Sequence, residues 1–183
     1  MTRPNDADNL FLTDGGLRPE LLGEGVPAVL QEAVRQADET NWDTVRTPHI
    51  FMGLLAVPDA AVCDWGKHLQ ADLPELLHQF RELFRQGEGA RRSITGFNRP
   101  FVSEQVILLL VEALGRAASR GRASLVPMDL LVAVFTTNAI VTECFERIGF
   151  TAARLVDLAN LAEGETGKRS SPDATKPWWK FWG

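Results

Sequence analysis

The feature of this 183-residue chain that most constrains its fold is an internal repeat. Shifted by 80 residues, one amphipathic stretch falls on a second stretch with the same apolar and small residues. Each set has the spacing of one helix face, and the two sets are Val26, Val29, Leu30, Ala33 and Ala37, and Val106, Leu109, Leu110, Ala113 and Ala117. The repeat predicts two copies of one helical unit.

After the turn that follows this first helix, the agreement continues at a shift of 79 residues, with Pro48 on Pro127 and Phe51 on Leu130. We therefore expect the second copy to lack one residue of this turn. Thr47 is expected to cap a short apolar helix that begins at Pro48. Neither copy is expected to bury enough core alone, so the sequence predicts an all-α, pseudo-twofold double four-helix repeat with eight helices.

Composition predicts the domain boundaries. Polar residues 1–16 are expected to form a flexible lead-in, with the apolar residues at 10–12 docking on the body. The double repeat is expected over 17–163, with copies at 17–86 and 102–163 joined by a Gly- and Arg-containing linker at 87–101. Residues 164–177 are expected to be a flexible tether, and 178–183 an aromatic C-terminal tip.

Charge and composition exclude several classes of protein. The net charge of −5 and pI of about 5.2 argue against nucleic acid as a partner. Two cysteines, Cys63 and Cys144, are too few for a disulfide framework and are expected to be small buried residues in a reducing compartment. With no secretory h-region and no apolar run long enough to span a bilayer, we expect a cytoplasmic protein.

No pattern of residues predicts chemistry. The three histidines, His49, His68 and His78, fall on different predicted helices, and His49 is expected to make a structural hydrogen bond. The sequence contains no Gly-x-x-x-x-Gly-Lys-[Ser/Thr] loop and no Gly-x-Ser-x-Gly elbow. We therefore expect no enzyme activity, no catalytic residue, no cofactor and no metal site.

The aromatic tip is the strongest candidate for partner binding, because it holds three of the five tryptophans. Its candidate residues are Trp178, Trp179, Lys180, Phe181 and Trp182. Three interpretations stay open: the tip docks on another protein, folds back on its own domain, or sits at a membrane surface. A weaker candidate is a basic strip near the linker, formed by Arg85, Arg91, Arg92 and Arg99, for which a solvated loop is the alternative.

One apolar run, Thr47-Pro48-His49-Ile50-Phe51-Met52-Gly53-Leu54-Leu55, occurs in the first copy, and the second copy has a weaker form of it over 126–134. Through these runs, residues 18–163 resemble the Clp N-terminal domain, the double repeat that precedes the ATPase modules of Clp-family unfoldases. The alanines of both amphipathic helices are similar to the paired small residues of the family, where two helices approach closely.

The resemblance implies a standalone protein-binding module without ATPase modules. Its expected role is to bind substrate proteins or adaptors for a Clp-type unfoldase or protease, or to regulate that machine, through the groove between the copies. The alternative is a scaffold at the membrane surface, held there by the tip. Some family members bind phosphoarginine through Glu and Thr residues, and here Pro48 and Pro127 stand at the Glu positions and Gly23 and Ser103 at the Thr positions. We therefore expect no phosphoarginine site.

Overall fold

The computed structural model describes residues 9–87, 89, 92–137 and 139–169. Over these residues the chain forms eight α-helices and two short 3-10 helices, with isolated β-bridges in place of strands. In chain order the elements are η1 (Pro19–Leu21), α1 (Val26–Glu39), α2 (Thr47–Ala56), α3 (Ala60–Leu69), α4 (Leu73–Phe84), η2 (Arg99–Phe101), α5 (Glu104–Ser119), α6 (Pro127–Thr137), α7 (Ala139–Glu146) and α8 (Ala152–Arg169). The expected all-α, eight-helix architecture is confirmed.

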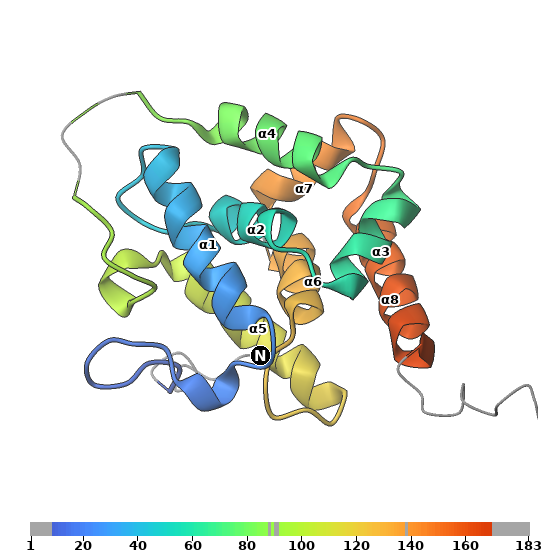
Figure 1. Ribbon diagram of the computed structural model, residues 1–183, viewed down its shortest axis with the longest axis horizontal. Helices are drawn as coiled ribbons and strands as arrows, with labels where there is room; N and C mark the ends of the chain where they lie inside the picture. Colours follow the sequence, from blue (N-terminus) through green and yellow to red (C-terminus); the bar gives the residue numbers. More distant parts are fainter. Residues whose placement is uncertain (1–8, 88, 90–91, 138, 170–183) are drawn as a thin grey trace, which may run out of the picture.

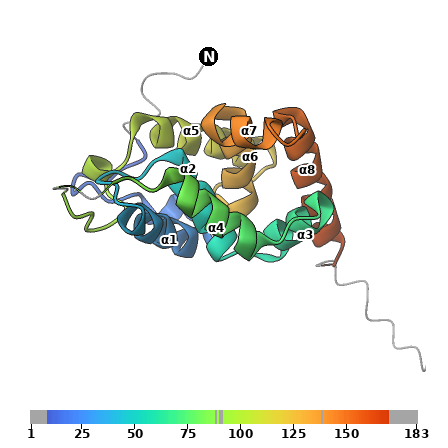
Figure 2. The same cartoon turned by 90° about the horizontal axis from the view of Figure 1, so that it is seen from above.

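The two short apolar helices, α2 and α6, lie in the middle of the molecule, because nearly every side chain on them is apolar and must be covered (Figure 1). Helix α1 packs on α2 and helix α5 on α6 at one end of the molecule, and α3 and α8 pack side by side at the other (Figure 2). An aromatic cluster joins both copies in one core, and its members are Phe51, Trp65, Phe80, Phe135 and Phe145. These rings come from α2, α3, α4, α6 and α7.

Two parallel β-bridges show the pseudo-twofold relation most clearly. Val45, before α2, pairs with Val102, before α5, and Leu125, before α6, pairs with Leu22, before α1. The hydrogen bonds match as well, since Val45 N–H donates to Phe101 O (2.7 Å) and Leu125 N–H donates to Leu21 O (2.8 Å). The segment before the first helix of each copy thus pairs with the connection between the first two helices of the other copy.

The residue missing from the second copy lies later than the sequence predicted. Asn41 and Gly121 both have positive φ after the first helix of their copies, so the shift is still 80 there. The shift is also 80 at the start of the second helix of each copy. There Arg46 N–H donates to His49 in the first copy, and Val126 N–H donates to Asp129 in the second.

The shift becomes 79 only between the second and third helices, since Gln70 and Gly149 share the next positive φ. The predicted match of Pro48 with Pro127 is therefore wrong. The structure matches Thr47 with Pro127 and Pro48 with Met128, and α2 begins at Thr47 rather than Pro48.

The expected close approach of two helices at small residues is confirmed in the first copy. A Cβ added to Gly53 of α2 would lie 2.5 Å from the backbone oxygen of Val29 and 3.1 Å from the backbone nitrogen of Ala33. Only a glycine leaves room for α1 at this distance.

The lead-in docks on the body at Leu10, as expected, because Leu10 is buried and its carbonyl accepts a hydrogen bond from Arg18 N–H (2.9 Å). Leu12, which was also expected to dock, is exposed. The predicted start of the tether differs from the structure. Helix α8 continues through Gly164 and Gly167 to Arg169, where a tether was expected. The pairing of Glu165 Oε2 with His68 Nε2 (3.1 Å) fastens this last part of α8 to α3. The remainder of the expected tether and the whole tip lie outside the described residues.

Two smaller expectations also need adjustment. Helix α4 ends at Phe84, two residues before the predicted end of the first copy. Cys63 and Cys144 are half-buried thiols rather than fully buried ones.

Among the described residues no single helix is long and apolar enough to cross a membrane. Helix α6 and the segment Ile140–Glu146 reach that length and apolarity only together, and they are bent by 80° relative to each other.

Candidate functional site

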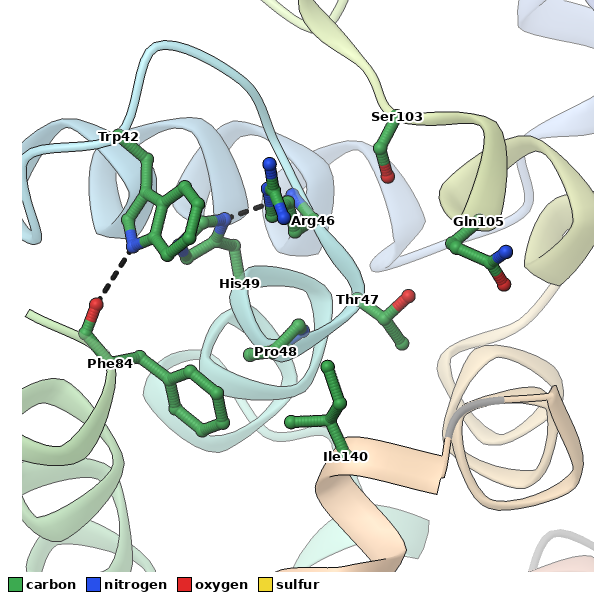
Figure 3. A pocket seen from close by; sticks show the side chains of 9 residues that line it. All are labelled: Trp42, Arg46, Thr47, Pro48, His49, Phe84, Ser103, Gln105 and Ile140. Carbon is green, nitrogen blue, oxygen red and sulfur yellow. Dashed lines mark hydrogen bonds between the residues drawn. The ribbon is translucent and has the colours of Figure 1, made fainter. Parts of the chain in front are cut away.

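A cavity of about 130 Å³ opens between the two copies, at the amino ends of α2, α5 and α7 and the carboxyl end of α4 (Figure 3). Its residues come from both copies and are Trp42, Arg46, Thr47, Pro48, His49, Phe84, Ser103, Gln105 and Ile140. Phe84 and Ile140 point toward each other, with Pro48 between them (Figure 3). The cavity lies between the copies, where the resemblance leads us to expect a binding groove.

The wall of the cavity is held by hydrogen bonds between the α1–α2 turn and the end of α4. Trp42 Nε1–H donates to the backbone oxygen of Phe84 at 2.7 Å. Asn41 Nδ2 donates to Gln86 O (3.0 Å), and Gln86 N–H donates back to Thr40 O (2.9 Å). These bonds hold the indole of Trp42 against the backbone at the end of α4, so this wall of the cavity is preformed.

His49 supports the cavity from behind, and its expected structural hydrogen bond is confirmed. Its Nδ1 accepts from Arg46 N–H (2.9 Å), which leaves Nε2 to carry the proton and donate to Thr40 Oγ1 (3.3 Å). Burial, with a smaller contribution from the nearby Arg46 charge, lowers the pKa of His49 to about 3. The imidazole is therefore neutral at pH 7 and positions the start of α2 rather than transferring protons.

The mouth of the cavity is polar on one side and apolar on the other. The Arg46 guanidinium is exposed and lies 4.3 Å from the centre of the Trp42 ring. Ser103 caps α5 by accepting a hydrogen bond from Val106 N–H. Ile140 is 52% exposed, an unusual position for a large aliphatic side chain at the rim of an apolar hollow.

The equivalent place in the second copy, at Arg122, Asp129 and Glu163, holds ion pairs, and we call it the mate site. In the register of the structure, Arg122 stands where Trp42 stands in the first copy, and Asp129 where His49 stands. Asp129 is fully buried and pairs with Arg116 (2.6 Å) and Arg122 (2.5 Å). Although burial raises the pKa of Asp129, hydrogen bonds from the arginines and Val126 outweigh it and hold the pKa below its usual value. Glu163 on α8 completes the network by pairing with Arg116 at 2.8 Å.

The residues that the resemblance singled out fall at these two places. Pro48 and Ser103 line the cavity, whereas Gly23 lies against the backbone of Leu125, where a Cβ would be 2.2 Å from its oxygen. The second Glu position is Met128 in the corrected register, rather than Pro127. Neither copy therefore has a carboxylate at that position.

The described arginines of the predicted basic strip make separate contacts within the domain. Arg85 pairs with Glu82 (3.1 Å), Arg99 pairs with Glu104 (2.5 Å), and Arg92 lies 4.7 Å from the centre of the Phe101 ring. None of these three lines the cavity. Arg91 and the tip residues 178–183 lie outside the described residues, so the tip and the strip stay predictions.

Sequence reasoning missed five cavity residues: Trp42, Arg46, Phe84, Gln105 and Ile140. The available signal was weak, since Trp42 sits in a turn and Ile140 at the start of a helix, where large apolar residues need a reason. Within the part of the chain that the structure describes, no group of three or more His, Cys, Asp or Glu side chains could hold a metal ion.

The comparisons with known proteins bear on the fold. No family model and no curated protein matches the sequence. The structure is similar to the N-terminal domain of the caseinolytic protease-associated chaperone ClpD from Arabidopsis thaliana, with a TM-score of 0.53, 16% identity, and coverage of 80% of this chain and 97% of that one. It is also similar to the N-domain of ClpV from Vibrio cholerae, with a TM-score of 0.56, 16% identity, and coverage of 78% and 84%. The chain therefore has a Clp N-domain-like fold, as its sequence predicted.

Proposed function

We propose that this domain is a non-enzymatic protein-binding module that holds one apolar side chain of a partner in the cavity between its two copies. The observation that carries the proposal is the preformed apolar hollow between Phe84 and Ile140, open at the surface. Engineered protein cavities of about 150 Å³ bind benzene, so a hollow of this size suits one aromatic or aliphatic side chain. A fixed apolar pocket with a polar rim is the usual centre of a protein interface.

The Clp N-domain-like fold supports the choice of partner. We propose that the partner is a substrate protein or an adaptor of a Clp-type unfoldase or protease, or a part of that machine. The aromatic tip, Trp178, Trp179, Lys180, Phe181 and Trp182, is proposed as a second contact. Because α8 reaches Arg169, only the residues after it link the tip to the body, and two weak contacts at this short range reinforce each other.

Affinity capture from lysate of the native cell tests the proposal with two matched full-length variants. Ile140→Asp places a carboxylate at the cavity mouth, whereas Ile148→Asp makes the same change at a more exposed position, 67% accessible, that does not line the cavity. We expect the wild type and Ile148→Asp to capture the same Clp-type protein, and Ile140→Asp to lose it.

Two results would contradict the proposal. Equal capture by Ile140→Asp and Ile148→Asp would place the partner elsewhere on the surface. Retention of only proteins with no relation to protein unfolding or proteolysis would remove the Clp role. Circular dichroism of both variants checks that each keeps the helical fold.

A further inference from the structure

This inference rests on the proposed function and names the ligand of the same cavity. We propose that the cavity selects a peptide in which a large apolar side chain lies next to a carboxylate, and that the domain holds one such peptide rather than two. The charges of the lining residues account for the preference for a carboxylate. The ion pairs of the mate site account for the binding of a single peptide.

The lining offers positive charge and no negative charge. Arg46 is the one ionised side chain among the nine lining residues, since His49 is neutral, and its guanidinium makes no ion pair within the described part of the chain. Glu104, the neighbour of Ser103 and Gln105 in sequence, is paired with Arg99 and does not line the cavity. An unpaired guanidinium stacked on an indole at the rim is suited to a carboxylate that follows the buried side chain.

The start of α2 adds to this preference. The ten-residue helix begins at Thr47, so its positive end faces the cavity lining. Thr47 is 2% exposed, and its hydroxyl has no hydrogen-bond partner among the described atoms. A buried hydroxyl without a partner is costly, and an incoming acceptor at this end of the helix would satisfy it.

The mate site cannot accept a second peptide of the same kind. Arg122 and Asp129 replace Trp42 and His49, and Glu163 replaces Phe84 in the register of the structure. Asp129 is fully buried and both arginines are already paired with it, so the charges that would attract a carboxylate are neutralised internally. The mate site is also narrow, because Gly25 lies so near Pro127 that an added Cβ would be only 3.2 Å from the proline ring.

NMR titration of the isotopically labelled full-length chain tests the inference with three blocked tetrapeptides: acetyl-Gly-Phe-Asp-Gly-amide and its Asn and Lys versions in place of Asp. The indole N–H of Trp42, which bonds Phe84 O, reports on the cavity. We expect the Asp peptide to bind about three-fold more tightly than the Asn peptide, the scale of one exposed charge pair, and the Lys peptide to bind most weakly.

Two variants assign that preference to Arg46. Arg46→Gln should bring the affinities for the Asp and Asn peptides to within experimental error of each other, whereas Arg154→Gln, an exposed arginine of α8 outside the cavity, should keep the three-fold difference. An Asp preference that survives Arg46→Gln overturns the inference.

The same titration tests the number of sites. We expect one binding event, with shifts around Trp42 and none at Arg122 or Met128, and shifts at both places overturn the single-site part. If the Phe peptides bind without a charge preference, the inference fails and the proposed function stands. If no peptide moves the Trp42 resonance, the cavity as a binding site fails, and both fall.

Other occupants have their own signature. If the cavity resonances move with protein concentration, a second copy occupies the cavity. If they move on Trp182→Ala with no peptide present, the tip of the chain occupies it. Either result overturns the inference.

Discussion

Asp129 holds in the second copy the place that His49 holds in the first. Asp129 accepts a hydrogen bond of 2.9 Å from Val126 N–H, and His49 accepts one of 2.9 Å from Arg46 N–H. Val126 and Arg46 are the residues directly before α6 and α2. One helix start is thus capped by a neutral imidazole under an indole, and the other by a carboxylate between two arginines. The same backbone geometry supports an open apolar cavity in one copy and an ion-pair network in the other.

The neutral state of His49 predicts an acid-sensitive stability. Its pKa falls from the ordinary 6.5 to about 3 on folding, so the unfolded chain binds a proton that the folded chain does not. This contribution is complete above pH 6.5 and is lost as the pH falls toward 3, at about 1.4 kcal/mol per pH unit.

Urea unfolding between pH 4.5 and 6 measures this dependence. In His49→Asn, whose amide oxygen can still accept from Arg46 N–H, the slope should decrease by about that amount. His78→Gln, a change on an exposed histidine, should leave the slope as in the wild type. An unchanged slope in His49→Asn would show that the imidazole titrates normally in the folded state.

Removal of the buried carboxylate should be strongly destabilising. Asp129→Ala leaves Arg116, 11% exposed, and Arg122 without their buried partner, and a broken buried pair costs about 3–5 kcal/mol. Asp129→Asn keeps an acceptor for Val126 N–H and should lose less. Chemical denaturation measures the free energy of unfolding of both variants. As a control, Glu82→Ala breaks an exposed ion pair with Arg85 and should cost less than about 1 kcal/mol. Equal losses for Asp129→Ala and Glu82→Ala would rule out the network as a stabilising element.

The contact between α1 and α2 predicts opposite effects for two glycine-to-alanine changes. Gly53→Ala would force the new methyl group to within 2.5 Å of Val29 O and should destabilise the fold by about 1–3 kcal/mol. Gly115→Ala, on an exposed face of α5 with no atom within 4 Å of the added Cβ, should stabilise it by about 0.5–1 kcal/mol. Thermal unfolding monitored by circular dichroism distinguishes them, and the same sign for both would contradict the packing at Gly53.

Vesicle co-sedimentation of the full-length chain tests one of the three interpretations of the aromatic tip, that it sits at a membrane surface. If the tip docks on a protein, the wild type and a Trp178→Ala, Trp179→Ala, Trp182→Ala variant should sediment equally little with vesicles containing anionic lipid. We expect this result, because so short a segment binds a membrane only marginally, even with Lys176 and Lys180 beside its aromatic residues. Sedimentation of the wild type alone would favour the membrane-surface scaffold.

The sequence predicted the architecture well because repeated apolar spacing is a local signal that survives divergence. The two helix faces containing Ala33 and Ala113 are buried as expected. The register near Pro48 and Pro127 was misjudged because proline is tolerated at more than one position of the first helical turn, so a matched pair of prolines does not fix the alignment. Hydrogen bonds at His49 and Asp129 fix it, and residues so different in type gave no such signal in the sequence.

The cavity could not be predicted in the same way. Trp42, Phe84 and Ile140 come from a turn, a helix end and a helix start, and only the packing of the two copies brings them together. The expected tether at residue 164 failed for a similar reason, because contacts such as that of Glu165 with His68 override the low helix propensity of Gly164 and Gly167.

The two β-bridges between the copies, Leu22–Leu125 and Val45–Val102, determine how this chain can fold. Each bridge joins residues far apart in the chain, so neither copy completes its own edge until the other is present, and folding must close long loops before these pairings form. A single copy made alone would present both unfilled positions, and two such molecules would satisfy each other by swapping leading segments into a symmetric dimer. The duplicated chain has the form of such a dimer, with its two subunits joined end to end.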